Sequence, residues 1–163
     1  YGISAFSLAQ DIDVTTSEAK AYISSYLNKY HGVREYMKKV VEEAKRNEYV
    51  TTLFGRRRYL PELKSANFNT RSFGERVALN TPIQGTAADI IKLAMVRVHS
   101  RLKREGLKAK LLLQVHDELI VEAPVAEEEA VKRILTEEME GVVKLTVPLT
   151  AEAHSGPNWL DAK

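Results

Sequence analysis

The chain has 163 residues, of which 44% are hydrophobic, 28% are charged and none is cysteine. This composition is typical of a globular protein with one core or two small lobes. Without cysteine, disulfides and thiolate metal sites are excluded, which fits the reducing cytoplasm. No apolar run approaches the roughly 20 residues of a membrane helix, so we expect no membrane segment. Because the sequence begins on Tyr1 rather than Met, we expect a piece of a longer chain.

The net charge of +2 hides an uneven distribution along the chain. Residues 1–115 hold 20 Lys and Arg against 11 Asp and Glu, whereas residues 116–163 hold 4 against 11. A basic body suits a polyanionic partner such as a nucleic acid. The alternative is charge carried on solvated helix faces without any partner.

Helices are predicted in the first part of the chain. The spacing of apolar residues makes a short helix plausible within residues 1–12. Thr15 and Glu18 form a capping box that opens a second helix through about Lys29, and we expect residues 31–32 (His-Gly) to end it. The apolar residues of 33–45 then recur at the helical period, which predicts an amphipathic helix.

A small hairpin with an arginine-rich end is predicted next. Residues 49–54 are rich in β-branched and aromatic side chains, and residues 59–61 return after a turn of glycine with Arg56, Arg57 and Arg58. Arginine offers bidentate donors to phosphate oxygens. The turn is therefore interpreted as a phosphate clamp, with a merely soluble turn as the alternative.

Two further helices are expected before the middle of the chain. The first covers residues 67–80 and should stop at residues 81–82 (Thr-Pro), because proline breaks helices and restricts the residue before it. The second should begin at Thr86 and run to about Glu105, where Gly106 terminates it.

The stretch from residue 111 to 122 predicts a β-hairpin with acids at its tip. Two apolar runs meet at His116, Asp117 and Glu118, and strands rich in Leu, Val and Ile bury at least one face. Arms anchored in this way would hold the acids rigidly, as metal-binding carboxylates must be held. A solvated turn remains the alternative from the pattern alone.

An amphipathic helix over residues 125–140 and a last strand over residues 145–152 complete the prediction. Pro148 suggests that this strand lies at a sheet edge. Antiparallel strands backed by long helices give an α+β architecture. No internal repeat or low-complexity tract is visible.

Five separated motifs resemble the C-terminal part of a family A DNA polymerase, the bacterial DNA polymerase I type. They lie in this order at residues 1–4, 53–61, 75–89, 114–118 and 159–163, and together they span the whole chain. One match of this kind could arise by chance. Five in the right order are specific.

The resemblance implies part of a right-hand polymerase, which synthesises DNA on a template by transferring dNTPs to a primer 3′ end. Residues 1–66 would be the fingers portion and residues 67–163 the C-terminal palm portion. Asp117 matches a catalytic aspartate that binds two Mg²⁺ ions, and Glu118 is the neighbouring acid of that motif. Two metals would stabilise the attacking oxygen and the leaving group, with carboxylates bridging them.

The rest of that active site would lie before residue 1. In the family, another catalytic aspartate is on an upstream strand, and the residues that grip the nucleotide are on a helix of which only the end, Tyr1, remains here. A single Asp cannot hold both ions. We therefore expect residues 1–163 not to polymerise without the remainder of the polymerase chain.

The resemblance also implies contacts with primer–template DNA. The positions that match contacts near the growing end, largely from the minor groove, are Arg76, Asn80, Gln84 and His116. That groove presents similarly placed acceptors for every correct base pair, so donors there can test pairing geometry. Helix-end capping by Asn80 and Gln84 and a satisfied surface imidazole at His116 are the structural alternatives.

Three further assignments are made on the nucleic-acid side. Tyr1 matches a tyrosine that stacks where the template base is placed, and Ser4 lies near the template path, with packing or capping as the alternative. The turn with Arg56, Arg57 and Arg58 is assigned loosely to DNA, because it could instead bind another protein.

Two other functions compete with this interpretation. A single-subunit RNA polymerase shares the tyrosine–glycine and histidine–aspartate elements, but it has a hydroxyl residue where this chain has Glu118. A catalytically silent duplex-binding module is the second alternative. It is disfavoured because carboxylates facing phosphates repel them unless metals intervene.

Overall fold

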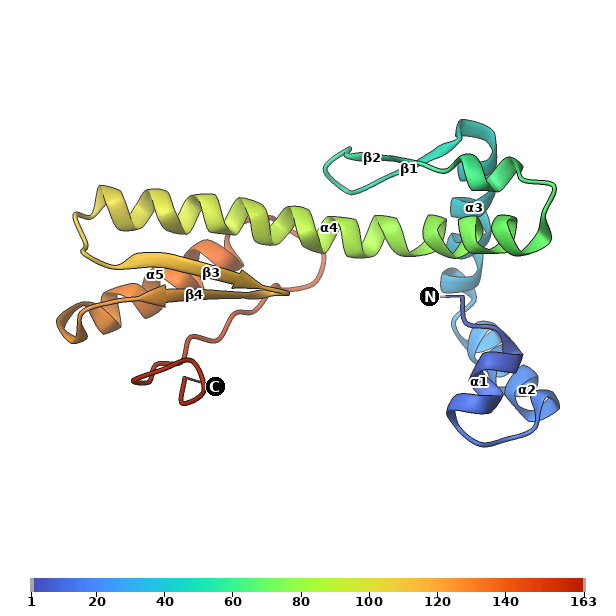
Figure 1. Cartoon of the computed structure of the whole chain (residues 1–163), viewed down its shortest axis with the longest axis horizontal. Helices are drawn as coiled ribbons and strands as arrows, with labels where there is room; N and C mark the ends of the chain where they lie inside the picture. The colour runs from blue at the N-terminus through green and yellow to red at the C-terminus, as the bar shows by residue number, and fades with distance from the viewer. Residues whose placement is uncertain (1, 163) are drawn as a thin grey trace. The chain divides into compact units, whose positions relative to one another are not determined.

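The computed structural model describes residues 2–162. The chain forms two compact units, Tyr1–Thr86 and Ala87–Lys163. The described residues are mostly helical and contain two antiparallel sheets of two strands each (Figure 1), which confirms the predicted α+β class. No helix within residues 2–162 combines the length and the apolar character needed to cross a membrane.

Three helices open the first unit: α1 (Ala5–Asp11), α2 (Thr16–Lys29) and α3 (His31–Asn47). The capping box that begins α2 is confirmed, because Thr15 Oγ1 accepts from the Glu18 N–H and the Glu18 carboxylate accepts from the Thr15 N–H. The predicted end of this helix at about Lys29 is confirmed, but His31 and Gly32 do not form the break. The chain leaves the helical conformation at Tyr30 (φ −104°, ψ 61°), and His31 and Gly32 are the first two residues of α3.

The capping box makes α2 sensitive to acid. Hydrogen bonds from the Thr15 hydroxyl and backbone N–H hold the pKa of Glu18 below its ordinary value of 4.5. This stabilisation is complete above pH 4.5 and is lost as the pH falls through the lowered pKa. The protection factors of α2 amides, which compare each exchange rate with its intrinsic rate at the same pH, should fall at low pH in the wild type but much less in Glu18→Gln, and an equal fall in both would contradict the capping role.

A small hairpin follows α3 and packs on it: β1 (Tyr49–Thr51), β2 (Arg57–Tyr59) and the short helix η1 (Pro61–Lys64). The hairpin is confirmed, but Arg57 and Arg58 lie in strand β2 and not in the turn. The turn consists of residues 52–56 and so comes earlier in the chain than predicted. The Thr52 N–H donates to the carbonyl of Arg56 at 2.9 Å, and this bond closes the turn. The hairpin helps to form the first core, which consists of Ala44, Val50, Leu60, Leu63 and Ala78.

Helix α4 (Phe68–Arg104) runs through Pro82, where two separate helices were expected. Proline removes one helical hydrogen bond and normally kinks or ends a helix. Here Thr81 Oγ1 donates to the carbonyl of Val77 at 2.7 Å, and Thr86 Oγ1 donates to the carbonyl of Pro82 at 2.5 Å. Ala78, fully buried one turn before the proline, anchors the helix in the first core. Packing and side-chain hydrogen bonds therefore outweigh the local preference.

Gly106 ends α4 as predicted. It adopts φ 70°, its N–H donates to the carbonyl of Lys103, and the next N–H, of Leu107, donates to Leu102. This pair of bonds is the Schellman arrangement, in which a left-handed residue closes the helix. The chain thereby turns back toward the helix it has just left.

The second unit packs a hairpin and a helix against the second half of α4 (Figure 1): β3 (Lys110–Val115), β4 (Glu118–Glu122), η2 (Val125–Glu127) and α5 (Glu128–Glu140). Leu119 and Val121 pack against the second core, on one face of the hairpin. Leu112 and Leu113 are half exposed, at 52% and 53%. The second core consists of Val98, Leu102, Ala109, Val131 and Ile134.

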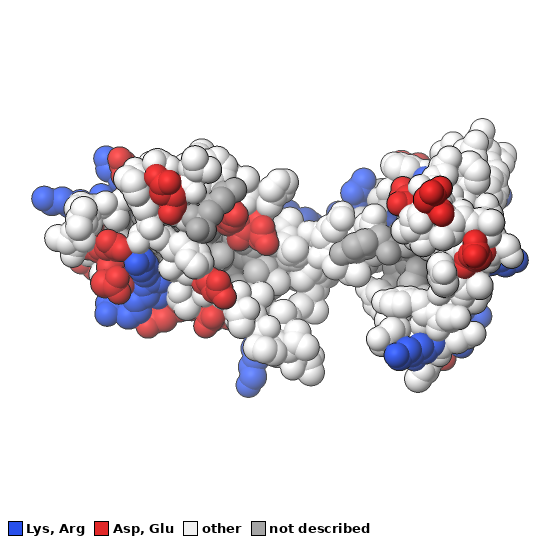
Figure 2. All heavy atoms as spheres, turned by 90° about the horizontal axis from the view of Figure 1, so that it is seen from below, with Lys and Arg blue, Asp and Glu red and all other residues white. Residues whose placement is uncertain are grey.

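Ion pairs join α4 to α5 beside this core. Arg101 contacts Glu105 at 2.8 Å, Glu137 at 2.6 Å and Glu138 at 3.1 Å. The hydrogen bonds that Arg101 donates to Glu105 and Glu137 raise the pKa of Arg101 above its ordinary value. On the face of the Ala87–Lys163 unit that Figure 2 shows, acidic side chains are spread over the surface and basic ones gather toward the outer end.

The last strand, predicted over residues 145–152, does not form. Within the described part of the chain no strand follows β4, and the segment after α5 is irregular. Pro148 cannot donate to a ladder, and polar side chains of α5 hold the segment in place. Glu140 accepts from the Ala151 N–H at 3.0 Å, and Glu128 accepts from the Ser155 hydroxyl at 2.5 Å.

Candidate functional site

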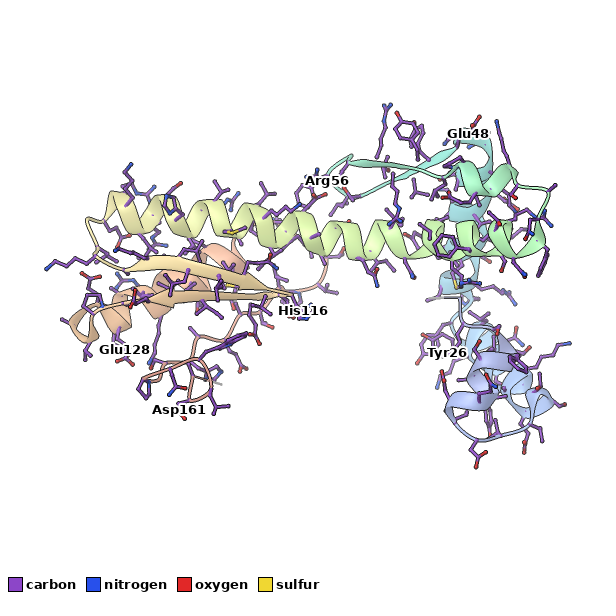
Figure 3. The ribbon with its side chains drawn as sticks, in the orientation of Figure 1. Tyr26, Glu48, Arg56, His116, Glu128 and Asp161 are labelled. Carbon is purple, nitrogen blue, oxygen red and sulfur yellow. The ribbon has the colours of Figure 1, made fainter. Side chains whose placement is uncertain are left out.

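The tip of the β3–β4 hairpin carries the three residues that the sequence singled out. Val115 pairs with Glu118, so His116 and Asp117 alone make the turn. His116 adopts φ 51°, in the left-handed region that few residues other than glycine occupy. The Gln114 side-chain amide donates to the carbonyl of His116 at 2.6 Å and fixes the turn from one strand. Figure 3 shows His116 at the end of the hairpin.

Asp117 and Glu118 are consecutive, exposed acids at this tip. Asp117 completes the turn and Glu118 is the first residue of β4. Carboxylate oxygens are the donors that Mg²⁺ prefers, and Mg²⁺ is commonly bound by one or two carboxylates together with substrate phosphates. Within residues 2–162, no three His, Asp or Glu side chains gather where they could hold a metal. The tip therefore offers two neighbouring carboxylates, which by themselves fall short of such a group.

Arg76, Asn80 and Gln84 recur every fourth residue of α4 and therefore share one side of the helix. Arg76 and Gln84 are exposed and Asn80 is half-buried. The Oδ1 atom of Asn80 is buried and has no hydrogen-bond partner within residues 2–162. Because α4 continues through Pro82, neither Asn80 nor Gln84 lies at a helix end. The alternative interpretation, helix-end capping, is therefore wrong for both.

Ser4 and Tyr1 have different outcomes. Ser4 is the N-cap of α1, where its Oγ accepts from the Ser7 N–H at 3.0 Å and lies 2.9 Å from the Ser7 Oγ. The capping alternative is thus correct for Ser4, and its exposed side chain leaves a template contact as a prediction. Tyr1 lies outside the described residues, so its stacking role also stays a prediction.

The three arginines of the first hairpin do not point the same way. Cross-strand partners share a face, and Arg58 is paired with the buried Val50 on the core side. Arg57 lies on the other face, with its guanidinium 4.9 Å from the centre of the Tyr49 ring. Arg56 precedes the strand at the hairpin end (Figure 3). A single row of phosphates could not engage all three arginines in the same manner.

Within each unit, the structure brings some predicted residues together. His116, Asp117 and Glu118 share one turn of the second unit, and the α4 side with Asn80 belongs to the first unit, as does the arginine hairpin. Sequence reasoning did not single out Gln114, although its position before the histidine was inside a recognised motif. It also missed the contact of Thr52 with the helix, whose only sequence signal is a glycine inside a predicted helical region.

The sequence profile described as DNA polymerase family A matches residues 1–161. The chain belongs to DNA polymerase family A. Similar relatives are the DNA polymerase I of Geobacillus stearothermophilus and that of Bacillus subtilis, each 56% identical over all 163 residues. The DNA polymerase I of Streptococcus pneumoniae is 47% identical over the same length. The chain spans 18–19% of the length of these family A relatives.

A solved family A structure has the same fold. It is the POL domain of Pol1 from M. smegmatis in complex with DNA primer-template and dNTP. The match has a TM-score of 0.96 and 45% sequence identity, and it covers 99% of this chain and 29% of that one. The predicted resemblance to family A is therefore confirmed over the whole chain.

Proposed function

We propose that this chain is the C-terminal part of a DNA polymerase I type enzyme, which acts in the bacterial cytoplasm. Such an enzyme adds dNTPs to the 3′ end of a primer as the template directs. The observation that carries the proposal is the near-complete structural match, at 45% identity, to a polymerase domain solved with primer-template and dNTP. At this identity over 99% of the chain, the partners of that domain are the reasonable partners of this one.

The proposal assigns residues 1–66 to the fingers and residues 67–163 to the palm. Asp117 would be a ligand of the two Mg²⁺ ions, and Glu118 would support it from the next position. Bound Mg²⁺ supplies positive charge that offsets the charge on the transferring phosphoryl group. The hairpin contributes rigidity, since the Gln114 amide and the strand register hold the turn that carries Asp117.

The remaining proposed contacts orient the DNA. Arg76, Asn80, Gln84 and His116 present donors that suit the acceptors of the minor groove. The buried Oδ1 of Asn80 has no partner in the described part of the chain and can only accept, so any contact of Asn80 with these groove acceptors would come from its side-chain NH2 group. These four side chains would test the geometry of the newest base pairs without reading their sequence.

Primer extension tests the proposed function directly. The full-length protein should extend an annealed primer with dNTPs and not with rNTPs, and preferred use of rNTPs would favour a single-subunit RNA polymerase. Residues 1–163 alone should give no extension, because no group of three His, Asp or Glu side chains within residues 2–162 could hold the metal. Circular dichroism must show helix in that fragment for its inactivity to count. Extension by the folded fragment would refute the prediction that an upstream part is required.

A further inference from the structure

The turn of the arginine hairpin is closed around Thr52. Its N–H donates to the carbonyl of Arg56 at 2.9 Å, and its Oγ1 accepts from the Arg56 N–H at 3.2 Å. The Gly55 N–H donates to the Thr52 carbonyl at 3.0 Å. Thr52 is only 6% exposed, whereas the adjacent Leu53 is 64% exposed. Thr52 therefore closes the turn through its hydrogen bonds, and its own side chain is buried.

The surface that receives Thr52 is Gly85 of helix α4. A Cβ added to Gly85 would lie 2.7 Å from Thr52 Cγ2, which is shorter than the usual contact distance between two non-bonded carbon atoms. The Thr52 side chain cannot easily rotate away, because it is β-branched and its hydroxyl is bonded to Arg56. The hairpin thus lies against the helix only because residue 85 has no side chain.

Thr86 adds a polar contact at the same point. Its Oγ1 accepts from the Leu53 N–H at 2.9 Å and donates to the carbonyl of Pro82 at 2.5 Å. A single hydroxyl therefore links the hairpin turn to the helix backbone. Glycine in a helix interior costs roughly 1 kcal/mol relative to alanine, so its presence at position 85 works against the helix and in favour of this approach.

We propose that Gly85 is a positioning residue for DNA binding, which holds the arginine hairpin against α4 through Thr52 and Thr86. Gln84, the proposed minor-groove contact, immediately precedes Gly85 in the helix. The contact therefore fixes the arginines relative to Gln84 and Asn80, so that phosphate and minor-groove contacts fall on one DNA. This inference rests on the proposed function, and it adds that the spacing between the two sets of contacts is set at residue 85.

The test measures how salt affects the binding of a primer–template duplex to the full-length protein, by fluorescence anisotropy. Each lost phosphate contact lowers the slope of log K against log salt by about 0.9. Arg57→Ala/Arg58→Ala should lower the slope by at least about one, and Gly85→Ala should lower it similarly. Adding Gly85→Ala to the arginine variant should change the slope little further.

A compensating variant separates positioning from general damage. Thr52→Ser removes the methyl that an alanine at position 85 would meet, while keeping the hydroxyl that accepts from Arg56. Gly85→Ala/Thr52→Ser should therefore recover at least about half of the lost slope. Gly32→Ala is the matched control, since that helical glycine has open space around it and should change nothing.

The outcomes distinguish phosphate contact by the arginine hairpin from the positioning role of Gly85. An unchanged slope in Arg57→Ala/Arg58→Ala would refute phosphate contact by the hairpin and, with it, the positioning role. A lowered slope there, with a wild-type slope in Gly85→Ala, would overturn the positioning role alone. A Gly85→Ala defect that Thr52→Ser does not repair would also overturn it, since the close approach would not be the cause.

Discussion

Asp117→Ala in the full-length protein should reduce nucleotide incorporation by about 10³-fold or more. Loss of a metal ligand removes several kcal/mol of transition-state charge stabilisation, and each 1.4 kcal/mol is about tenfold in rate. Affinity for primer–template DNA should stay within about twofold, because Asp117 is an exposed acid of a turn that the backbone and Gln114 maintain. Single-turnover incorporation and duplex binding, measured separately, check both parts.

Two neighbouring acids serve as controls for this variant. Glu118→Ala should lower incorporation less than Asp117→Ala, because its proposed role is a supporting one. Glu122→Ala changes an exposed acid at the far end of the same strand, opposite Lys110, and should leave the rate unchanged. Normal incorporation by Asp117→Ala would refute the metal assignment. An equal loss in all three variants would point to general electrostatics instead.

Ile134→Ala should loosen the second unit by about 3 kcal/mol. Ile134 is fully buried in the core between α4, α5 and the hairpin, and truncation of such a side chain costs about 2–5 kcal/mol through lost burial and the cavity left behind. Hydrogen exchange followed by mass spectrometry suits a long chain, in which global unfolding is not two-state. Protection of the β3–β4 amides should fall by about 100-fold.

Val125→Ala is the matched control for this prediction. Val125 precedes the same helix, but its side chain is 87% exposed, so its removal should leave the exchange of β3–β4 unchanged. The amides of α2, in the other unit, should also exchange as in the wild type. Unaltered protection of β3–β4 in Ile134→Ala would mean that this core does not hold the β3–β4 hairpin in place.

The elements that the sequence predicted well are those with short-range signals. The capping box of Thr15 and Glu18, the left-handed stop at Gly106 and the hairpin around His116 each depend on residues within a few positions of one another. The α5 helix was also recognisable, because its apolar residues recur at the helical period. In these elements the local sequence preferences and the tertiary packing favour the same structure.

The predictions that failed depended on distant contacts. Pro82 predicted a break, but Ala78 before it is buried against the hairpin, and Thr86 after it bonds to Leu53. The segment around Pro148 resembled a strand, yet no partner strand lies beside it in the described part of the chain. A window of ten residues shows neither the contacts that support the helix around Pro82 nor the lack of a partner strand near Pro148.

The candidate site shows the same division. The residues at the tip and on α4 were located by motifs, and the four-residue spacing of Arg76, Asn80 and Gln84 then followed from helical geometry. The contact of Thr52 with Gly85 joins positions 33 residues apart and leaves no periodic trace. Its only sequence signal is a glycine inside a helix. Such a glycine is less favourable than alanine for the helix, so it can indicate a close packing contact.

The left-handed backbone of His116 also determines what a library of all amino acids at this position would report. Glycine and asparagine tolerate φ near 51° and would keep the turn without the imidazole, whereas valine and isoleucine would fail on backbone grounds alone. A comparison of the glycine and asparagine variants with the wild type therefore isolates the imidazole. Any additional loss of activity in the valine variant measures the contribution of the left-handed backbone conformation at residue 116.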